Sequence, residues 1–129
     1  MRYSVKTSLR NQLIDITDLV IQSVTASEAS RGLVNVFVPH TTAAITINEN
    51  SDPDVVHDIL HWMVDTIPNS SEFKHLEGNS DAHIKATLVG SSISIPFSDR
   101  SLLLGTWQCV YFCEFDGPRN REIIVTVIE

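Results

Sequence analysis

Short runs of β-branched and apolar residues recur along this chain, and they limit its fold more than any other feature. Runs of this kind, with apolar side chains at alternate positions, are typical of β-strands. They outnumber the helical segments and do not alternate regularly with them, which predicts an α+β fold with a largely antiparallel sheet or a two-layer sandwich. The runs expected to form strands are Tyr3–Leu9, Leu13–Ile16, Leu33–Pro39, Ala43–Asn48, Ile93–Phe97, Cys109–Phe115 and Glu122–Ile128.

The strongest helix signal lies in the middle of the chain. Asp52 is placed to cap a helix, Pro53 suits the first helical position, and the apolar pattern continues to about Thr66. Two strand runs before it, Leu33–Pro39 and Ala43–Asn48, are expected to pair around a polar tip. Two further helices are expected, from the N-cap Thr17 to Gly32 and from Asn79 or Ser80 to Gly90.

Composition excludes several classes of protein. The 129 residues, 43% of them hydrophobic, predict one domain over residues 1–129. A formal net charge of -7 disfavours nucleic-acid binding, which needs clustered Lys and Arg. Neither a signal peptide nor a membrane-spanning run is recognisable, so we expect a soluble, cytoplasmic protein with no membrane partner. Cys109 and Cys113 are expected to be buried, reduced thiols.

The stretch from His75 to His83 carries the densest group of candidate site residues. It holds two imidazoles, the Glu77 carboxylate, the Asn79 carboxamide and Gly78. Imidazole and carboxylate groups bind zinc-like cations and also transfer protons in acid–base catalysis. If a helix begins at Asn79, both imidazoles flank its N-terminus, where an anion binds favourably. The alternative interpretation is a surface loop whose Asn and Asp residues cap that helix.

Other polar groups give weaker signals. The hydroxyls of His40-Thr41-Thr42 can donate to a phosphate or a carboxylate, although a polar strand end is more often a turn. Asn48 supplies an acceptor near the start of the central helix, where capping explains much of the local pattern. His57 and His61 have the i, i+4 spacing of helical zinc sites, but several Asp residues share their side of the helix. We interpret that side as a solvated face.

Two carboxylates lie on an otherwise apolar face of the run Cys109–Phe115 and its continuation. Glu114 and Asp116 continue the alternation of Val110 and Phe112, so in a strand their side chains lie on that apolar face. An isolated buried carboxylate is costly there. Arg119 and Arg121 follow shortly and are the natural partners. Both a structural ion pair and a role in ligand binding remain open.

Several of these motifs also occur together in a known family. The runs His40–Glu49, Asp52–Asp54, His75–Ala86 and Gly105–Gln108, continued through Glu114–Arg119, closely resemble the YjbQ family, whose members are also called secondary thiamine-phosphate synthases. The resemblance extends in order over most of the chain from residue 33 onward. It implies a small α+β sandwich that assembles as a homotrimer with sites near subunit boundaries.

The same resemblance implies one polar pocket that contains His40 together with the cluster from His75 to His83. A divalent metal, zinc or magnesium, is expected in it as a cofactor. The implied metal ligands are His40, His75 and His83, and the candidate substrate-binding residues are Thr41, Thr42, Asn48, Trp107, Arg119 and Arg121.

The leading functional hypothesis is a metal-dependent enzyme that acts on a small phosphorylated or anionic substrate. Glu77 is then the general base or a fourth metal ligand, Asn79 orients the substrate, and His40 belongs to the catalytic group. The reaction classes are a thiamine-phosphate synthase-like transfer and a metal-dependent hydrolysis. The alternative is a noncatalytic homotrimeric module that binds a metabolite or a metal.

The family activity itself joins a pyrimidine diphosphate to a thiazole phosphate, and the leaving diphosphate must be neutralised. Only Lys85, Arg119 and Arg121 supply positive charge near the motif. We therefore expect this activity to be secondary to another reaction of the same pocket.

Overall fold

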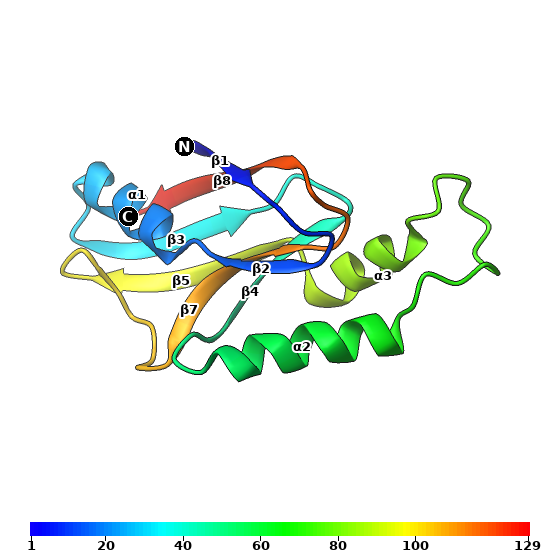
Figure 1. Cartoon of the computed structure of the whole chain (residues 1–129). Helices are drawn as coiled ribbons and strands as arrows, with labels where there is room; N and C mark the ends of the chain where they lie inside the picture. Colours follow the sequence, from blue (N-terminus) through cyan, green and yellow to red (C-terminus); the bar gives the residue numbers. More distant parts are fainter.

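Two antiparallel sheets form the framework of the chain in the computed structural model, which describes residues 1–129 (Figure 1). The five-stranded sheet has the order β1-β8-β3-β5-β6, and the three-stranded sheet has the order β2-β7-β4. The strands are β1 (Arg2–Lys6), β2 (Gln12–Asp15), β3 (Arg31–Phe37), β4 (Ala43–Glu49), β5 (Ser92–Ser98), β6 (Ser101–Leu102), β7 (Gln108–Glu114) and β8 (Asn120–Ile128). The helices are α1 (Thr17–Ser27), α2 (Pro53–Thr66) and α3 (Ser80–Val89). The predicted α+β class with antiparallel sheets is confirmed.

The main core lies between the two sheets. Val34 and Val36 of β3 and Val125 of β8 belong to the same buried cluster as Val110 and Phe112 of β7. Each strand contributes alternate residues, because successive side chains of a strand point to opposite faces. The sequence alternation therefore identifies the inward faces of both sheets.

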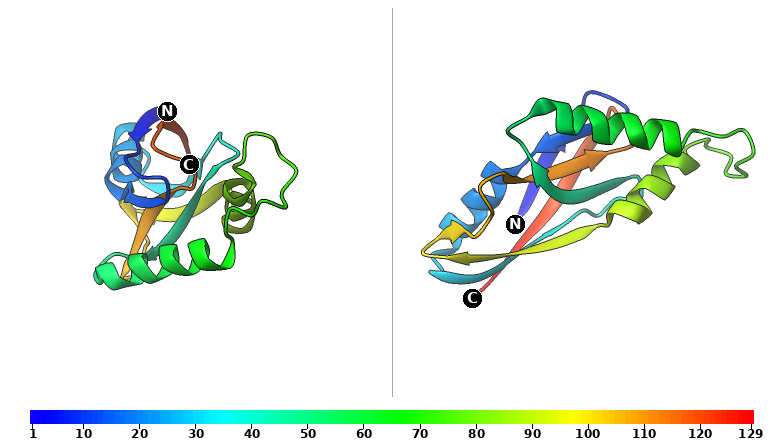
Figure 2. Two further views of the ribbon diagram at one scale, coloured as in Figure 1. Left: turned by 45° about the vertical axis from the view of Figure 1, so that its right-hand side comes forward. Right: turned by 90° about the horizontal axis from the view of Figure 1, so that it is seen from below.

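Helices α2 and α3 lie on the outer side of the three-stranded sheet (Figures 1 and 2). Ala82 of α3 packs there with Ala44 of β4, Cys113 of β7 and Phe115 in a second, smaller cluster. Cys113 and Cys109 are both free and buried, as predicted. None of the three helices is long and apolar enough to span a membrane.

The start of α2 follows the sequence prediction. The Asp52 side chain accepts a hydrogen bond from the Asp54 N–H at 2.9 Å, and Pro53 is the first helical residue. Proline is tolerated there because the first backbone N–H groups of a helix have no intrahelical acceptor. The helix ends at Thr66, also as predicted.

The prediction for α1 was wrong at both ends. Thr17, predicted as the N-cap, is already helical, and the helix ends at Ser27, where Glu28 takes a left-handed conformation with φ of 63°. Gly32 does not close the helix but lies in β3, where an added Cβ atom would be 2.0 Å from the Ile128 carbonyl oxygen. The glycine is needed for the close approach of the end of β8.

The predicted pairing of the third and fourth strand runs was also wrong. β3 lies between β5 and β8, whereas β4 pairs with β7 in the other sheet. Residues 38–42 therefore connect one sheet to the other. The Val38 N–H donates to the Ser91 carbonyl at 2.8 Å, and the Phe115 N–H donates to the Thr42 carbonyl at 3.2 Å. His40 lies on this connecting segment.

Candidate functional site

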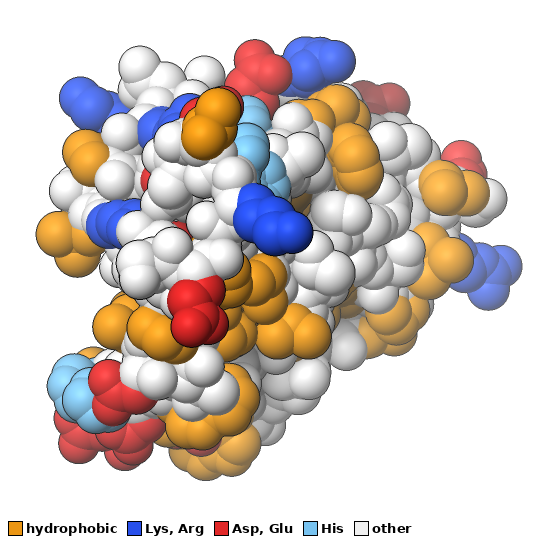
Figure 3. All heavy atoms as spheres, turned by 90° about the vertical axis from the view of Figure 1, so that its right-hand side faces the viewer, with side chains coloured by type: hydrophobic (Ala, Val, Ile, Leu, Met, Phe, Trp, Pro, Cys, Tyr) orange, Lys and Arg blue, Asp and Glu red, His pale blue; other side chains and the backbone are white.

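A polar pocket of about 410 Å³ lies where three separate segments of the chain meet. The connection between the sheets, the segment that leads into α3 and the start of β8 all contribute to it. Its lining residues, all polar except Pro39, are Pro39, His40, Thr41, Thr42, His75, Glu77, Asn79, His83, Arg119 and Arg121. Figure 3 shows histidine side chains beside a basic side chain on this face of the molecule. The pocket suits a small polar ligand rather than an apolar one.

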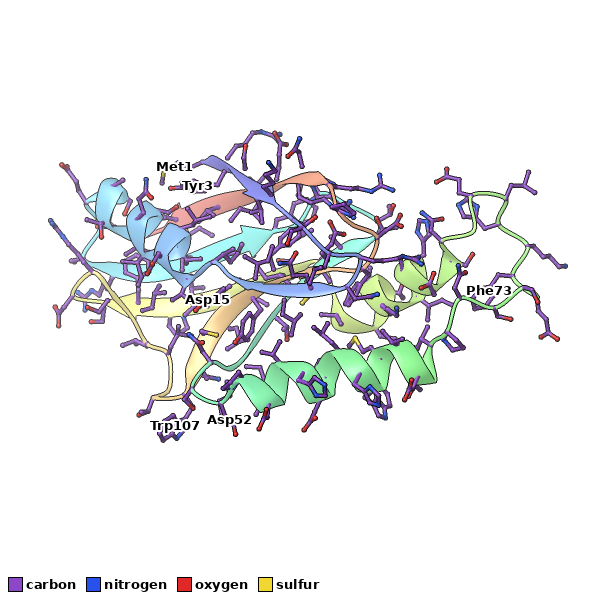
Figure 4. All side chains as sticks on the ribbon, viewed as in Figure 1. Met1, Tyr3, Asp15, Asp52, Phe73 and Trp107 are labelled. Carbon is purple, nitrogen blue, oxygen red and sulfur yellow. The ribbon has the colours of Figure 1, made fainter.

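The structure brings together all of the predicted site residues except Asn48 and Trp107. These two lie at the opposite end of the β4–β7 strand pair, where Glu49 is the register partner of Gln108. A strand of this length separates its ends by about 20 Å, so neither residue reaches the pocket of its own chain. Trp107 lies near the start of α2, far from the loop that carries Phe73 (Figure 4).

A buried ion pair between Arg121 and Glu114 lies at the candidate site, and Arg121 lines the pocket. The Arg121 guanidinium donates from Nε to Glu114 Oε1 at 2.9 Å and from Nη2 to Glu114 Oε2 and to Thr42 Oγ1. Thr7 Oγ1 also donates to Glu114 Oε1, at 2.8 Å. Nη1 of Arg121 makes no hydrogen bond within the protein, and this nitrogen is not fully buried. It is therefore a free donor on a residue that lines the pocket.

These contacts determine the charge of Glu114. Burial alone would raise the pKa of this carboxyl, but hydrogen bonds from Arg121, from Thr7 and from the Asp116 N–H outweigh it and leave the pKa below its ordinary value. The carboxylate is consequently ionised and matches the Arg121 charge. The sequence-based expectation that the carboxylates pair with Arg119 and Arg121 is confirmed.

His40 is oriented by the backbone of β8. The Glu122 N–H donates to His40 Nε2 at 3.0 Å, so the proton of the neutral imidazole resides on Nδ1. Burial and the nearby Arg121 charge both lower the pKa of His40 and favour this neutral form. His40 thus offers an N–H donor, and its Nε2 lone pair is already used.

A second guanidinium is held by Asp116. Arg119 donates from Nη2 to Asp116 Oδ2 at 2.8 Å and from Nε to the Asp116 carbonyl at 2.9 Å. The Asn79 side chain donates from Nδ2 to the same Oδ2 atom, also at 2.8 Å. Arg119 Nη1 has no partner within the protein, so a second guanidinium donor is free on a residue that lines the pocket.

His75 and His83 lie close together, with their ring centroids 5.4 Å apart and the rings nearly perpendicular. Neither ring makes a hydrogen bond to the protein, and the Glu77 side chain is exposed on the same loop. Nevertheless no three His, Cys, Asp or Glu side chains converge as metal ligands anywhere in the chain. Because Nε2 of His40 accepts the Glu122 N–H, the three imidazoles do not form a ligand set in this arrangement.

The other candidate cations and histidines lie outside the pocket. Lys85, which the sequence places near the motif, is almost fully buried and its Nζ contacts Asn11 Oδ1 at 3.1 Å and Asp81 Oδ2 at 3.4 Å. The i, i+4 spacing of Asp81 and Lys85 is the sequence signal for this pair. His57 and His61 are exposed beside acidic residues, which agrees with a solvated face.

Comparison with known proteins identifies the family. The family model described as "UPF0047 protein YjbQ-like" matches residues 1–129, and the chain belongs to this family. A UPF0047 protein of Methanocaldococcus jannaschii is 52% identical over 127 residues, covering 98% of this chain and 92% of its own. The UPF0047 protein YugU of Bacillus subtilis is 43% identical over 125 residues, with 96% and 95% covered.

A solved structure supports the same assignment. The crystal structure of an uncharacterised YjbQ/UPF0047 family protein from Clostridium acetobutylicum has a TM-score of 0.97 and 55% sequence identity to this chain. It covers 99% of both chains. The fold and the family are therefore shown together.

We predict that Glu114→Gln destabilises the protein by about 3 to 5 kcal/mol, because it leaves the buried Arg121 charge without its counter-ion. Urea denaturation at neutral pH measures this change. The matched control is Glu122→Gln, which removes an exposed carboxylate paired with Arg2 and should cost less than about 1 kcal/mol. Equal stability of the two variants would contradict the role given to the buried pair.

The pH dependence of stability provides an independent check of the same ion pair. Because the folded-state pKa of Glu114 is lowered, its stabilisation is present above the ordinary Glu value of about 4.3 and is lost as the pH falls through the lowered pKa. The Glu114→Gln variant should lack this part of the acid-induced loss of stability.

Proposed function

We propose that the pocket binds a small phosphorylated or otherwise anionic molecule and catalyses a reaction on it. The observation that carries the proposal is the pair of free Nη1 donors of Arg119 and Arg121, both on residues that line one polar pocket. Guanidinium donors held in place by carboxylates recognise phosphate and carboxylate oxygens well, because little conformational entropy is lost on binding.

The remaining lining residues support the same ligand class. His40 adds an N–H from Nδ1, and Thr41 adds an exposed hydroxyl. A pocket of about 410 Å³ suits a small molecule rather than a polymer. Glu77 is the exposed carboxylate among these donors, and we assign it the role of general base, with Asn79 orienting the substrate.

Metal dependence is a separate part of the proposal. His75 and His83 are neighbours with unpaired rings, so they would supply two ligands to a divalent metal. Glu77 would complete the set only after its side chain moves toward them, since no three such side chains converge in this arrangement. A bound zinc or magnesium ion would supply Lewis-acid chemistry. His40 would join them only after release of its hydrogen bond from Glu122.

Two alternatives follow from the charges in the pocket. A thiamine-phosphate synthase-like transfer needs neutralisation of a leaving diphosphate, and the two guanidinium groups favour it. However, Glu114 and Asp116 already compensate both guanidinium charges, which favours a noncatalytic module that holds a small anion.

In either case we propose a homotrimer, since Trp62 and Leu88 are mostly exposed and no residue of α2 is buried in one chain. Sedimentation as a monomer at micromolar concentration would contradict the trimer.

Inorganic phosphate should bind to the wild-type chain and raise its thermal stability, because a ligand that binds only the folded state stabilises it. We predict that Arg119→Gln weakens phosphate affinity about tenfold or more, through loss of a charged donor. Calorimetric titration measures the affinity. Arg31→Gln, a change at an exposed arginine in β3, is the matched control and should bind normally. Unchanged affinity in Arg119→Gln would remove the anion site from this pocket.

Metal content distinguishes the two histidine pairs of the chain. Protein purified without added metal should retain zinc, and the double variant His75→Ala, His83→Ala should lose it. The double variant His57→Ala, His61→Ala removes two exposed imidazoles of α2 and should retain it. If the wild type and the pocket variant hold equally little metal, the proposed ligands are wrong.

Catalysis by Glu77 is tested with the family reaction. With magnesium, a pyrimidine diphosphate and a thiazole phosphate, the wild type should form thiamine phosphate and release diphosphate. Glu77→Gln should reduce the rate about 100-fold or more through loss of a carboxylate that would bind the magnesium ion. Glu72→Gln, on the same loop, should keep the wild-type rate. No product from the wild type would exclude the transferase and favour the binding module.

A further inference from the structure

One buried polar atom in the chain has no hydrogen-bond partner, the side-chain oxygen Oδ1 of Asn79. Asn79 is 7% exposed and lines the polar pocket. All other buried side-chain nitrogen and oxygen atoms are paired, so this oxygen departs from the rule that the rest of the fold obeys. A buried acceptor without a donor costs free energy that is recovered when a donor arrives.

The orientation of the Asn79 amide is set by its neighbours. Nδ2 donates to Asp116 Oδ2 at 2.8 Å, and a reversed amide would place two oxygen acceptors against each other. Asp116 is itself held by Arg119 at 2.8 Å, with Arg10 Nη2 at 3.8 Å from its other oxygen. The unpaired atom is therefore an oxygen, and it needs a donor.

Helix α3, which begins directly after Asn79, does not use this oxygen either. Asn79 is the N-cap of α3, where an asparagine side chain ordinarily accepts a hydrogen bond from the second or third helical N–H. No such bond forms here. Oδ1 of Asn79 therefore takes part neither in the ion-pair network nor in a helix cap, and neither role explains why it is buried.

We infer that the anionic ligand of this pocket also carries an O–H or N–H donor, and that Asn79 Oδ1 accepts it. This inference rests on the proposed function. The same Asp116 oxygen joins the Asn79 amide and the Arg119 guanidinium, so the donor and the anionic group of the ligand lie close together. The ligand class is a short phosphorylated or carboxylated alcohol or amine. A phosphate ester of a simple hydrocarbon would leave the acceptor unpaired.

Asn79 is thus a specificity-determining residue. A site with a buried hydrogen-bonding group rejects analogues that lack the matching group much more strongly than an apolar site rejects a missing methylene. The competing donor within the pocket is an imidazole N–H of His75 or His83, since neither ring has a partner. If an imidazole turned to Asn79 instead, ligands with and without a hydroxyl would bind equally.

Three probes separate these outcomes in calorimetric titrations of the full chain. Inorganic phosphate measures the anion site alone, while glycerol 1-phosphate and propyl phosphate share chain length and charge but differ in hydroxyl groups. We expect the wild type to bind glycerol 1-phosphate about tenfold or more tightly than propyl phosphate, because only the former pairs the buried oxygen. In Asn79→Ala this preference should fall below about twofold, because the acceptor that distinguishes the two esters is gone.

The control is Asn69→Ala, which truncates an exposed asparagine on the same loop and should retain the preference. Equal affinity of the wild type for the two esters, together with normal phosphate binding, overturns the inference and leaves the proposed function intact. Failure of all three probes to bind overturns the proposed function and the inference with it. Because the comparison of the two esters uses the wild type, it remains decisive even if Asn79→Ala does not fold.

Discussion

The buried ion pair between Glu114 and Arg121 is the interaction on which the candidate site depends. Glu114 ends β7 of the three-stranded sheet, and Arg121 lies near the start of β8 of the five-stranded sheet, so the pair ties the two sheets together at one end. Thr7 and Thr42 complete the hydrogen bonding of the pair. Such a pair adds little net stability compared with apolar packing, but loss of one partner is severe. Its consequence here is geometric, because it fixes a guanidinium with one free donor.

The same end of β8 orients a second group of the pocket. Glu122 follows Arg121, and its backbone N–H holds His40 from 82 residues away in the sequence. One strand end therefore positions a cation through its side chain and an imidazole through its backbone. Asp116 acts similarly on Arg119 and Asn79 from the other side. Both guanidinium groups are thus fixed before any ligand arrives, which favours tight recognition of a small anion.

Local sequence patterns predict the elements of this fold better than the way they assemble. The start of α2 depends on Asp52 and Pro53, which act within one turn, and the pattern identifies it correctly. The position of Gly32 depends on the carbonyl of Ile128, which is distant in sequence, and the same residue-level reasoning places the glycine at a helix end. The sequence pattern also does not predict that the chain passes from one sheet to the other between β3 and β4. The partner strands β8 and β7 show the same alternation of apolar residues, so the pattern does not distinguish them.

The candidate site shows the same division. The residues from His75 to His83 are recognisable because their polar groups are dense and local, and the family motifs add His40. The motifs do not indicate that Asn48 and Trp107 lie at the far end of the strand pair, nor that Lys85 of α3 is buried. The tautomer of His40 and the unpaired oxygen of Asn79 arise from contacts with β8 and with Asp116, and only the three-dimensional arrangement reveals them.

The five histidines of the chain offer the most direct test of the central claim, that this pocket is an anion site built around a neutral His40. Nuclear magnetic resonance of the imidazole rings during a phosphate titration follows each histidine separately. We predict that His40 is protonated on Nδ1, and that the rings of His40, His75 and His83 shift together and saturate while those of His57 and His61 do not. A His40 ring protonated on Nε2, or phosphate-induced shifts confined to the α2 histidines, would contradict the claim.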